Sequence, residues 1–405
     1  MRSEDRVIIA GGGPVGLVTA LALAQRAIPV VVLEAEAEPL KDQRGVAFHP
    51  PTLEMLATLG IGDDLHALGL VVPVWQIRDR AEDAVIAAFD LGILADETPY
   101  PYRLHLGQHL LVPVLLDRLR LLPHAEIRFD CRVHAVTQDE QRVRVLARSA
   151  DGAETALGGR WLIGADGAHS AVRKACGIAF EGFTWPERFL VTNIAIDLAR
   201  LGYARTNYVA DPERWAVVLK LSDAEGKSLW RVTYGVDPNL PDTAVLLEEE
   251  VQRRLAEIIP GAFGPFPLRY AGSYGVHQRV AETFRIGRVL LAGDAAHINN
   301  PLGAFGLNSG IHDAMNLAAK LARVWDGADD SAVLDQYVRQ RRHANVAYVQ
   351  ASSIRNKRLL EERDPISRRA AYDELRRIAG DPALAKPYLL NTSMIASVRD
   401  AATVA

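Results

Sequence analysis

Short apolar runs and one glycine-rich break organise the first 35 residues of the chain. Val7–Ala10 and Val30–Leu33 are apolar at every position, and residues 17–26 between them have the alanine and leucine content of a helix. Runs of this kind are typical of strands buried on both faces of a parallel sheet. The pattern therefore predicts a strand, a glycine-rich turn at residues 11–16, a helix and a second strand.

The buried-strand pattern returns twice, and a different pattern separates the two returns. Residues 161–164 and 289–292 are again apolar, whereas residues 188–236 contain runs that alternate like the strands of an antiparallel sheet. The elements predicted beyond the first unit are strands at 75–79, 84–89, 126–133, 142–147, 161–164, 189–197, 206–210, 215–221, 229–236, 268–276 and 289–292, and helices at 110–122, 245–259 and 306–324. The chain therefore leaves a parallel fold and comes back to it.

We predict an α/β fold with two domains and a helical tail. A Rossmann-like nucleotide-binding domain with a parallel sheet is expected to be discontinuous, over residues 1–72, 100–178 and 277–345. An α+β substrate-binding domain with an antiparallel sheet is expected over 73–99 and 179–276. A helical C-terminal segment follows over 346–405. This tail can either cover the functional site or make the contact of a homodimer, and the sequence leaves both open.

Composition and charge narrow the class of protein. The 405 residues carry a formal net charge of −4 with no long block of one sign, which argues against broad electrostatic binding of nucleic acid or of an anionic membrane. Two cysteines, Cys131 and Cys176, are too few for a disulfide scaffold and indicate a reducing compartment. The apolar run at 7–10 is too short for a signal peptide or a membrane span. These features predict a cytoplasmic protein.

Gly11, Gly13 and Gly16 have the spacing of the dinucleotide-binding fingerprint. The first makes a tight turn, the second lets the backbone approach a pyrophosphate, and the third lets the helix pack on the strand. The phosphates then lie at a helix N-terminus, where free N–H groups and the helix dipole favour an anion. Glu34, at the end of the next strand, is placed to accept hydrogen bonds from ribose hydroxyls. These residues predict a dinucleotide cofactor without distinguishing NAD from FAD.

Two later segments distinguish the two cofactors. Asp166-Gly167 follows the apolar run at 161–164, and Gly293-Asp294-Ala295-Ala296-His297 ends the run at 289–292 and precedes Pro301, Gly303, Gly306 and Asn308. With the first fingerprint, these segments resemble, in order and spacing, the three motifs of the class A flavoprotein hydroxylases, the family typified by 4-hydroxybenzoate hydroxylase. The resemblance runs from Val7 to about Leu321. It implies FAD as the cofactor and a 4-hydroxybenzoate hydroxylase-like fold.

The resemblance also implies particular cofactor contacts. The residue matching Asp294 hydrogen-bonds a ribityl hydroxyl of FAD, and the segment from Pro301 to Asn308 surrounds the isoalloxazine ring. Asp166 is expected to serve FAD and NAD(P)H together, and Arg44 and Gln108 match residues that contact the cofactor. The residues expected to bind the cofactor are Gly11, Gly13, Pro14, Val15, Gly16, Glu34, Ala35, Arg44, Gln108, Asp166, Gly293, Asp294, Pro301, Gly303, Gly306, Leu307 and Asn308.

The same resemblance implies a monooxygenase that uses NADH or NADPH and O₂ to hydroxylate a small phenol or aminoarene through a C4a-hydroperoxyflavin. Removing a phenol proton raises the nucleophilicity of the ring, so a base or proton relay is useful. His49 and Tyr274 are the candidate catalytic residues, although a local structural role explains either of them as well. The candidates for contacting the substrate are Asn193, Tyr208, Trp215 and Tyr234, for which alternation does not tell which face of the sheet each occupies.

Other functions on the same scaffold compete with this one. A flavin-dependent halogenase is disfavoured, because no lysine lies between Lys41 and Lys174 and no Trp-x-Trp-x-Ile-Pro motif is present. A Baeyer–Villiger-type oxygenase, a flavin reductase and a non-catalytic FAD-binding protein stay open. Acidic residues at 36 and 38 would repel a 2′-phosphate, which favours NADH slightly. No metal site is expected, because His297 has no partner ligand at a suitable spacing.

Overall fold

A six-stranded sheet forms the first half of the molecule. The computed structural model describes residues 4–39, 45–221, 228–262 and 264–405. The strand order in this sheet is β18-β19-β12-β1-β2-β8, and all neighbours are parallel except β18 and β19. Its strands are β1 (Val7–Ala10), β2 (Val30–Leu33), β8 (Ala125–Arg128), β12 (Trp161–Gly164), β18 (Arg285–Ile286) and β19 (Val289–Leu291). The predicted buried strands therefore lie side by side, as expected for a Rossmann-like sheet.

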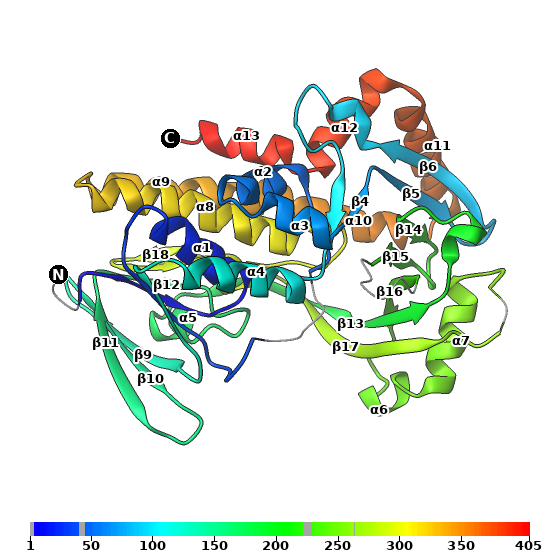
Figure 1. Ribbon diagram of the computed structural model, residues 1–405. Helices are drawn as coiled ribbons and strands as arrows, with labels where there is room; N and C mark the ends of the chain where they lie inside the picture. Colours follow the sequence, from blue (N-terminus) through cyan, green and yellow to red (C-terminus); the bar gives the residue numbers. More distant parts are fainter. Residues whose placement is uncertain (1–3, 40–44, 222–227, 263) are drawn as a thin grey trace.

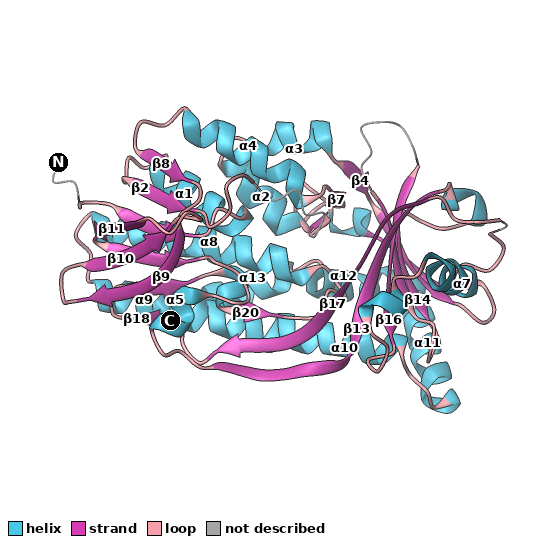
Figure 2. Cartoon of the chain, turned by 90° about the horizontal axis from the view of Figure 1, so that it is seen from below, coloured by secondary structure: helices cyan, strands magenta, loops and turns pink. Residues whose placement is uncertain are grey.

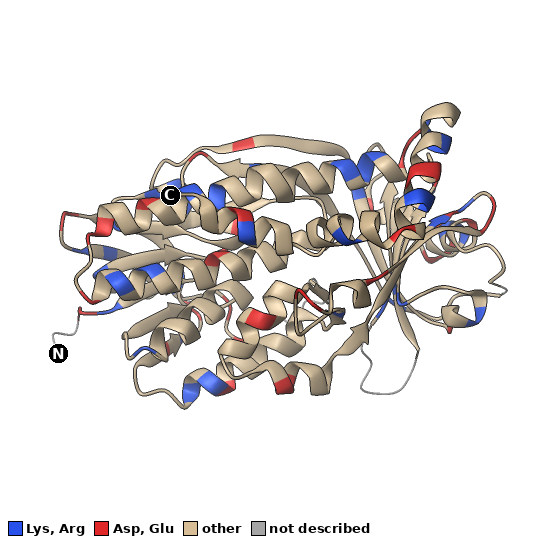
Figure 3. Ribbon diagram, turned by 90° about the horizontal axis from the view of Figure 1, so that it is seen from above, with Lys and Arg blue, Asp and Glu red and all other residues tan. Residues whose placement is uncertain are grey.

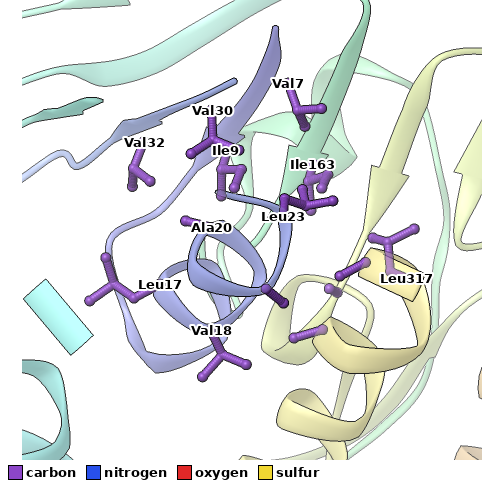
Figure 4. Packing of buried hydrophobic residues seen from close by; sticks show 14 of the residues in the cluster. Val7, Ile9, Leu17, Val18, Ala20, Leu23, Val30, Val32, Ile163 and Leu317 are labelled. Atoms are coloured by element: carbon purple, nitrogen blue, oxygen red, sulfur yellow. The ribbon is translucent and has the colours of Figure 1, made fainter. Parts of the chain in front are cut away.

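Helices cover one face of the parallel sheet and a small sheet covers the other. The helix α1 (Pro14–Ala24) packs against α4 (Gln108–Arg120) and α8 (Phe305–Trp325). Figure 4 shows the side chains of Val7, Ile9 and Val30 close to those of α1. The antiparallel sheet of β9 (Arg132–Gln138), β10 (Val143–Arg148) and β11 (Glu154–Gly159) contributes to the same core. This core holds the glycine-rich turns at one edge of the sheet.

An eight-stranded sheet forms the second half. Its order is β20-β17-β13-β16-β15-β14-β5-β6, antiparallel throughout except for the β14–β5 pair. Its strands are β5 (Val74–Asp79), β6 (Ala84–Asp90), β13 (Phe180–Ala195), β14 (Thr206–Ala210), β15 (Ala216–Lys220), β16 (Leu229–Val236), β17 (Leu268–Ala281) and β20 (His297–Ile298). The long strands β13 and β17 run as a ribbon between the two halves (Figure 2). The boundary predicted between residues 276 and 277 falls inside β17.

The two faces of the eight-stranded sheet bury separate cores. On one face, Trp75, Phe189 and Tyr208 pack with residues of the C-terminal helices. On the other face, Trp230 and Tyr234 pack with the helix at residues 248–258, which follows β16 along the chain. The helices around this sheet are α6 (Asp242–Val245), α7 (Glu248–Ile258), α10 (Ala351–Leu360), α11 (Pro365–Gly380) and α12 (Pro382–Thr392), whereas α13 (Ile395–Thr403) packs against α9 (Asp330–Ala344), α12 and α2 (Pro50–Thr58). Figure 1 shows α11 and α12 lying beside β6, so the C-terminal segment covers the sheet rather than extending away from it.

A fourth sheet, of three strands, lies between the two halves. It consists of β3 (Ala47–Phe48), β7 (Arg103–His105) and β4 (Leu70–Val72), in that order. The helices α2 (Pro50–Thr58) and α3 (Gly62–Leu68) connect its strands, and α5 (Ala171–Ala175) and α9 (Asp330–Ala344) complete the fold. No helix in the described ranges is both long and apolar enough to cross a membrane. Lysine and arginine positions are intermixed with acidic positions along the ribbon in Figure 3.

The predicted fold class is confirmed, with two differences in the elements. The single strand expected at 126–133 is two strands, β8 in the parallel sheet and β9 in the small antiparallel sheet, because the chain turns at Asp130 with φ of 52°. The helix expected at 245–259 is α7, which begins only at Glu248, because Leu246 and Leu247 separate it from the short helix α6. Alternation along the sequence does not mark either break, because apolar residues stand at both of them.

Candidate active site

The fingerprint glycines make the tight contacts that their spacing predicts. A Cβ added at Gly11, which has φ of 107°, would lie 2.3 Å from the Ala165 carbonyl oxygen, and one at Gly16 would lie 2.0 Å from the Gly11 oxygen. At Gly13 the same atom would meet nothing within 4 Å. Gly13 is also the N-cap of α1, and no side chain caps that helix. The open N-terminus of α1 fits a pyrophosphate.

Glu34 closes the glycine-rich loop instead of projecting freely from β2. Its carboxylate accepts hydrogen bonds from the backbone N–H of Gly12 at 2.5 Å and of Glu36 at 3.0 Å. Ala35 lies between the two acidic residues. A carboxylate has about four acceptor positions, so ribose hydroxyls can still bind here.

The Asp166-Gly167 turn packs directly on the first glycine turn. One carboxylate oxygen of Asp166 accepts the backbone N–H groups of Ala171 at 2.8 Å and Val172 at 3.1 Å, at the start of α5. The other oxygen is buried and has no hydrogen-bond partner among the residues described. Buried polar atoms are rarely left without a partner. A donor group of a bound cofactor would satisfy this oxygen, so the site fits FAD at this point as well.

A buried charge cluster holds the Gly293-Asp294 turn in place. Asp313 on α8 accepts hydrogen bonds from the Gly293 N–H at 3.0 Å, from His297 Nε2 at 2.6 Å and from Arg341 Nε at 2.6 Å. Burial opposes ionisation of Asp313, but His297 and Arg341 outweigh it and hold the pKa of the carboxyl below its ordinary value. Asp294 itself is exposed, between buried neighbours. His297 is thus engaged with Asp313, and within the described ranges no three His, Cys, Asp or Glu side chains are placed to hold a metal.

Asn308 joins the third motif to the segment around His49. Its side-chain oxygen accepts hydrogen bonds from the His49 N–H at 2.8 Å and the Thr52 hydroxyl at 2.6 Å. Its side-chain nitrogen donates to the carbonyl oxygens of Ala47 at 2.8 Å and Ala304 at 2.6 Å. These bonds use both hydrogens of the amide. The Asn308 side chain therefore shapes the loop before α8, and only its backbone could donate to a cofactor.

His49 is fully buried beside the same loop. Its Nε2 lies 2.8 Å from the Gly303 carbonyl oxygen, and its ring stacks on Phe305 with 5.8 Å between centroids. Its Nδ1 is buried without a partner in the described part of the chain. Burial, together with the nearby Arg103 cation, holds the pKa of His49 well below 6.5. Near neutral pH the imidazole is therefore uncharged.

Two more residues predicted near the cofactor, Gln108 and Leu307, lie around Gly45. A Cβ at Gly45 would lie 2.8 Å from Leu307 and 3.1 Å from the side-chain oxygen of Gln108, and the Gln108 N–H donates to the Gly45 oxygen. Phe305 begins α8 after Ala304, which has φ of 60°, Gly306 is the second residue of the helix, and no side chain caps this helix either. Pro301 is exposed, and a Cβ at Gly293 would lie 2.9 Å from Val15. Arg44 lies outside the described residues.

A cavity opens where the third motif meets the eight-stranded sheet. The space between its side chains is about 380 Å³ when open solvent is included, and about 20 Å³ of it is free for the centre of a water-sized sphere, so side chains must move apart to admit a ring. The residues lining it are Trp75, Ile77, Arg103, Tyr208, Gly303, Phe305, Asn356, Leu359, Leu360, Tyr388 and Thr392. A second hollow, between α4 and β8, contains none of the motif residues. The aromatic cavity is therefore the candidate substrate site.

Aromatic rings from four elements pack together at this cavity, and those of Trp75, Tyr208 and Tyr388 line it. Trp75 on β5 stacks on Phe89 at 4.5 Å and on Tyr388 at 6.2 Å, and it meets Tyr208 edge-on at 5.6 Å. Tyr388 belongs to α12, so the C-terminal segment contributes directly to the candidate site. Flat apolar walls of this kind suit a single aromatic ring.

The residues predicted to contact the substrate do not all reach this cavity. Tyr208 lines it, whereas Trp215 packs beneath it on Phe189 at 4.8 Å. Asn193 lies on the same face as Phe189, and its side chain accepts a hydrogen bond from Arg231 Nε at 3.1 Å. The prediction that Tyr234 contacts the substrate is wrong. Its side chain points to the opposite face of the sheet and belongs to the other core.

Tyr274 on β17 is 37% exposed, lies 6.3 Å from Phe189, and is not among the lining residues. Arg103, Trp75 and Tyr388 also line the cavity, and no motif in the sequence marks any of them.

Comparison with known proteins identifies the cofactor. A family model described as "FAD binding domain" matches residues 4–352. The chain belongs to this family. The chain is 41% identical over 398 residues to para-nitrophenol 4-monooxygenase of Pseudomonas sp. (strain WBC-3), covering 96% of each chain. It is 37% identical over 368 residues to 6-hydroxy-3-succinoylpyridine 3-monooxygenase HspB of Pseudomonas putida (strain DSM 28022 / S16), covering 90% of this chain and 91% of that protein.

Solved structures agree with the sequence relatives. The hydroxylase superposes on p-nitrophenol 4-monooxygenase PnpA from Pseudomonas putida DLL-E4 with a TM-score of 0.91 and 37% identity, covering 96% of this chain and 98% of that one. It also resembles aklavinone-11 hydroxylase, solved with FAD and aklavinone, with a TM-score of 0.78 and 26% identity over 89% of this chain and 70% of that one. The expected family is confirmed. The protein is an FAD-dependent aromatic monooxygenase of the class A type.

Proposed function

We propose that the hydroxylase takes electrons from NADH or NADPH and delivers oxygen to the ring carbon para to the hydroxyl group of a phenol or hydroxypyridine. The observation that carries the proposal is the aromatic cavity at Gly303 and Phe305, directly beside the loop that would surround the flavin ring. Its flat walls suit one ring, and its place suits a reaction at the cofactor.

The names of two relatives support the position of attack. Carbon 4 of para-nitrophenol carries the nitro group and lies para to the hydroxyl. Carbon 3 of 6-hydroxy-3-succinoylpyridine carries the succinoyl group and likewise lies para to the hydroxyl. We infer the same preference for this hydroxylase: a ring whose hydroxyl group faces an electron-withdrawing substituent across the ring.

The residues of the chain have distinct tasks in this proposal. Trp75 and Tyr388 offer flat surfaces against which the ring packs, and the buried lining keeps bulk water away from the reacting atoms. The loop at Gly303, tied to His49, fixes the distance between ring and cofactor. Bound FAD would supply the activation of O₂, with two electrons from the nicotinamide.

With para-nitrophenol as substrate the reaction balances as follows. One oxygen atom of O₂ bonds to the carbon that carries the nitro group, and the other atom leaves as water. The carbon–nitrogen bond then breaks, nitrite leaves with the bonding electron pair, and the ring becomes a quinone. NAD(P)H supplies the two electrons that the second oxygen atom requires.

The test is a panel of phenols and hydroxypyridines with the FAD-loaded enzyme. NAD(P)H oxidation, H₂O₂ and nitrite would be measured together, and products identified by mass. We expect one nitrite for each NAD(P)H consumed with para-nitrophenol, after subtraction of H₂O₂. Formation of a nitrocatechol without nitrite would reject attack at the para carbon. NAD(P)H consumption matched fully by H₂O₂ across the panel would reject hydroxylation of these rings.

A further inference from the structure

We propose that Arg103 is the anion-binding residue of the substrate cavity, where it binds an anionic oxygen carried by the aromatic ring, with the indole N–H of Trp75 beside it. The inference rests on the proposed function to the extent that this cavity is the substrate site. It adds a specificity rule: the hydroxylase binds phenolates, or rings with an acidic substituent, in preference to neutral rings of the same shape.

Arg103 is buried and its charge is not neutralised by a carboxylate. Its side chain is 3% exposed and lines the cavity. Its hydrogen bond within the described part of the chain is a long one, 3.4 Å from Nη1 to the Tyr208 hydroxyl. Its Nε is buried without a partner. A buried cation without a counter-charge is costly, so a site that keeps one is suited to an anionic ligand.

Two further buried polar atoms without partners belong to residues lining the same cavity. They are Trp75 Nε1 and Thr392 Oγ1. The guanidinium carbon of Arg103 lies 5.2 Å from the centre of the Trp75 ring, so the two N–H donors belong to neighbouring side chains. An indole N–H can only donate a hydrogen bond. Two donors and one positive charge are complementary to an oxygen anion.

The titratable groups around Arg103 do not compensate its charge. His49 is held uncharged, burial lowers the pKa of His105 to about 4, and burial raises the pKa of Tyr388 to about 12. These groups come from the segment before α2, from β7 and from α12. None of the described lining residues carries a carboxylate. The cavity is therefore positive near neutral pH.

The position of Arg103 in the fold explains how the charge reaches this cavity. Arg103 is the first residue of β7, in the small sheet between the two halves, and pairs there with Val72. Val72 belongs to β4, and β5, the strand that follows β4 along the chain, carries Trp75. The small sheet thus places a cation from the FAD-binding side at the edge of the substrate sheet. A guanidinium is suited to this task because its fixed fork can bind an oxygen anion through two N–H groups.

The experiment measures ligand binding to the FAD-loaded protein without NAD(P)H. 4-Nitrophenol is titrated between pH 5.5 and 8.5, and the phenolate absorption band reports whether the bound ring is ionised. We expect the wild-type protein to lower the pKa of the bound phenol by about one unit or more. Arg103→Gln should abolish this shift and weaken phenolate binding about 10- to 100-fold, the range for a charge-assisted hydrogen bond. Unchanged affinity of Arg103→Gln for both 4-nitrophenol and 4-methoxybenzoate would overturn the proposal.

Two controls separate the anion site from general damage. Arg78 on β5 is also a buried arginine, but Asp83 pairs with it at 3.2 Å, so Arg78→Gln should leave phenolate affinity unchanged. Arg103→Lys keeps the charge and should retain part of the pKa shift, which provides the answer if the glutamine variant does not fold. Equal loss in Arg78→Gln and Arg103→Gln would also overturn the proposal.

Two ligands distinguish the source of the anionic oxygen. 4-Nitroanisole has no ionisable hydroxyl, and 4-methoxybenzoate has a carboxylate but no hydroxyl. If Arg103→Gln weakens 4-nitrophenol alone, the phenolate oxygen is the ligand. If it weakens 4-methoxybenzoate alone, the substituent is the ligand. A loss that is equal for 4-nitroanisole would reject an anion site.

This test is independent of the proposed reaction. A wild-type protein that binds phenolate through Arg103 but hydroxylates no ring would reject the function and keep the anion site. Hydroxylation with the same KM and the same pH dependence in Arg103→Gln would reject the anion site and keep the function.

Discussion

His49 donates a hydrogen bond from Nε2 to the Gly303 carbonyl oxygen at 2.8 Å, across 254 positions of the sequence. A carbonyl oxygen can only accept, so the bond fixes the tautomer with the proton on Nε2. A buried imidazole with a lowered pKa is a weak base near neutral pH. The arrangement supports a role for His49 in positioning the loop that precedes α8, and this role competes with the expectation of a catalytic base.

The first prediction separates these two roles. His49→Ala should retain FAD but divert a larger share of NAD(P)H to H₂O₂, because the Gly303 loop loses its buried hydrogen bond. His49→Gln can donate from its amide nitrogen and should restore much of the coupling. The measurement is the ratio of H₂O₂ to product with 4-nitrophenol. Loss of one limb of the pH–rate profile in both variants would instead indicate a base.

The second prediction concerns Asp294, the exposed carboxylate between buried neighbours. If it binds a ribityl hydroxyl, Asp294→Ala should raise the Kd for FAD by about 10- to 100-fold, as expected for loss of a hydrogen bond to a charged group. Asp294→Asn keeps an acceptor and should fall between. The Kd follows from flavin fluorescence on titrating apoprotein. FAD occupancy equal to the wild type in Asp294→Ala would remove Asp294 from the cofactor site.

The positions of the glycine and aspartate turns can be predicted from the sequence, because the backbone at each turn restricts which residue fits there. Gly11, Gly16 and Gly293 stand where a Cβ would collide with neighbouring atoms, so composition and position coincide. The parallel strands follow from apolar runs for a similar reason, because burial on both faces excludes polar residues.

The substrate cavity has no such local mark. Arg103 lies on a strand of three residues, too short for any periodicity to appear, and Tyr388 lies in a tail without a motif. The strands that carry Tyr208 and Tyr234 do not differ in their sequence pattern, yet only Tyr208 faces the cavity. The reason is that α12 packs on the face of the sheet that carries Tyr208 and α7 packs on the face that carries Tyr234. These assignments depend on contacts between distant segments, which a single sequence does not contain.

The third prediction concerns the cluster under the Gly293 turn. Asp313→Asn replaces an acceptor-only carboxylate by an amide whose nitrogen would face the Gly293 N–H, His297 or Arg341. The turn that carries Asp294 should loosen, and FAD should bind roughly 10-fold more weakly. The control is Asp335→Asn, which removes an ion pair with Arg285. Because the Asp335 side chain is 54% exposed, this change should leave the Kd for FAD unchanged. Equal Kd values for Asp313→Asn and the wild type would show that the cluster does not support the cofactor turn.

The last prediction follows from His312, which is buried on α8 with Nε2 at 2.9 Å from the Thr52 hydroxyl. Burial lowers its pKa from 6.5 to about 3. The unfolded chain therefore binds a proton that the folded chain excludes between these values, so stability rises with pH in this window and is lost on acidification. Between pH 7.5 and pH 4.5 the loss from this residue is about 3 kcal/mol.

His312→Gln tests this, because its amide can still donate to Thr52 but does not titrate. We expect a free energy of unfolding near the wild-type value at pH 7.5 and a smaller decrease toward pH 4.5, measured by urea unfolding at one fixed FAD concentration. The matched control is the exposed His124, where His124→Gln should leave the slope unchanged. If His312→Gln loses stability on acidification as steeply as the wild type, then His312 is not excluded from protonation in the folded protein, and its bond to Thr52 does not depend on a neutral ring.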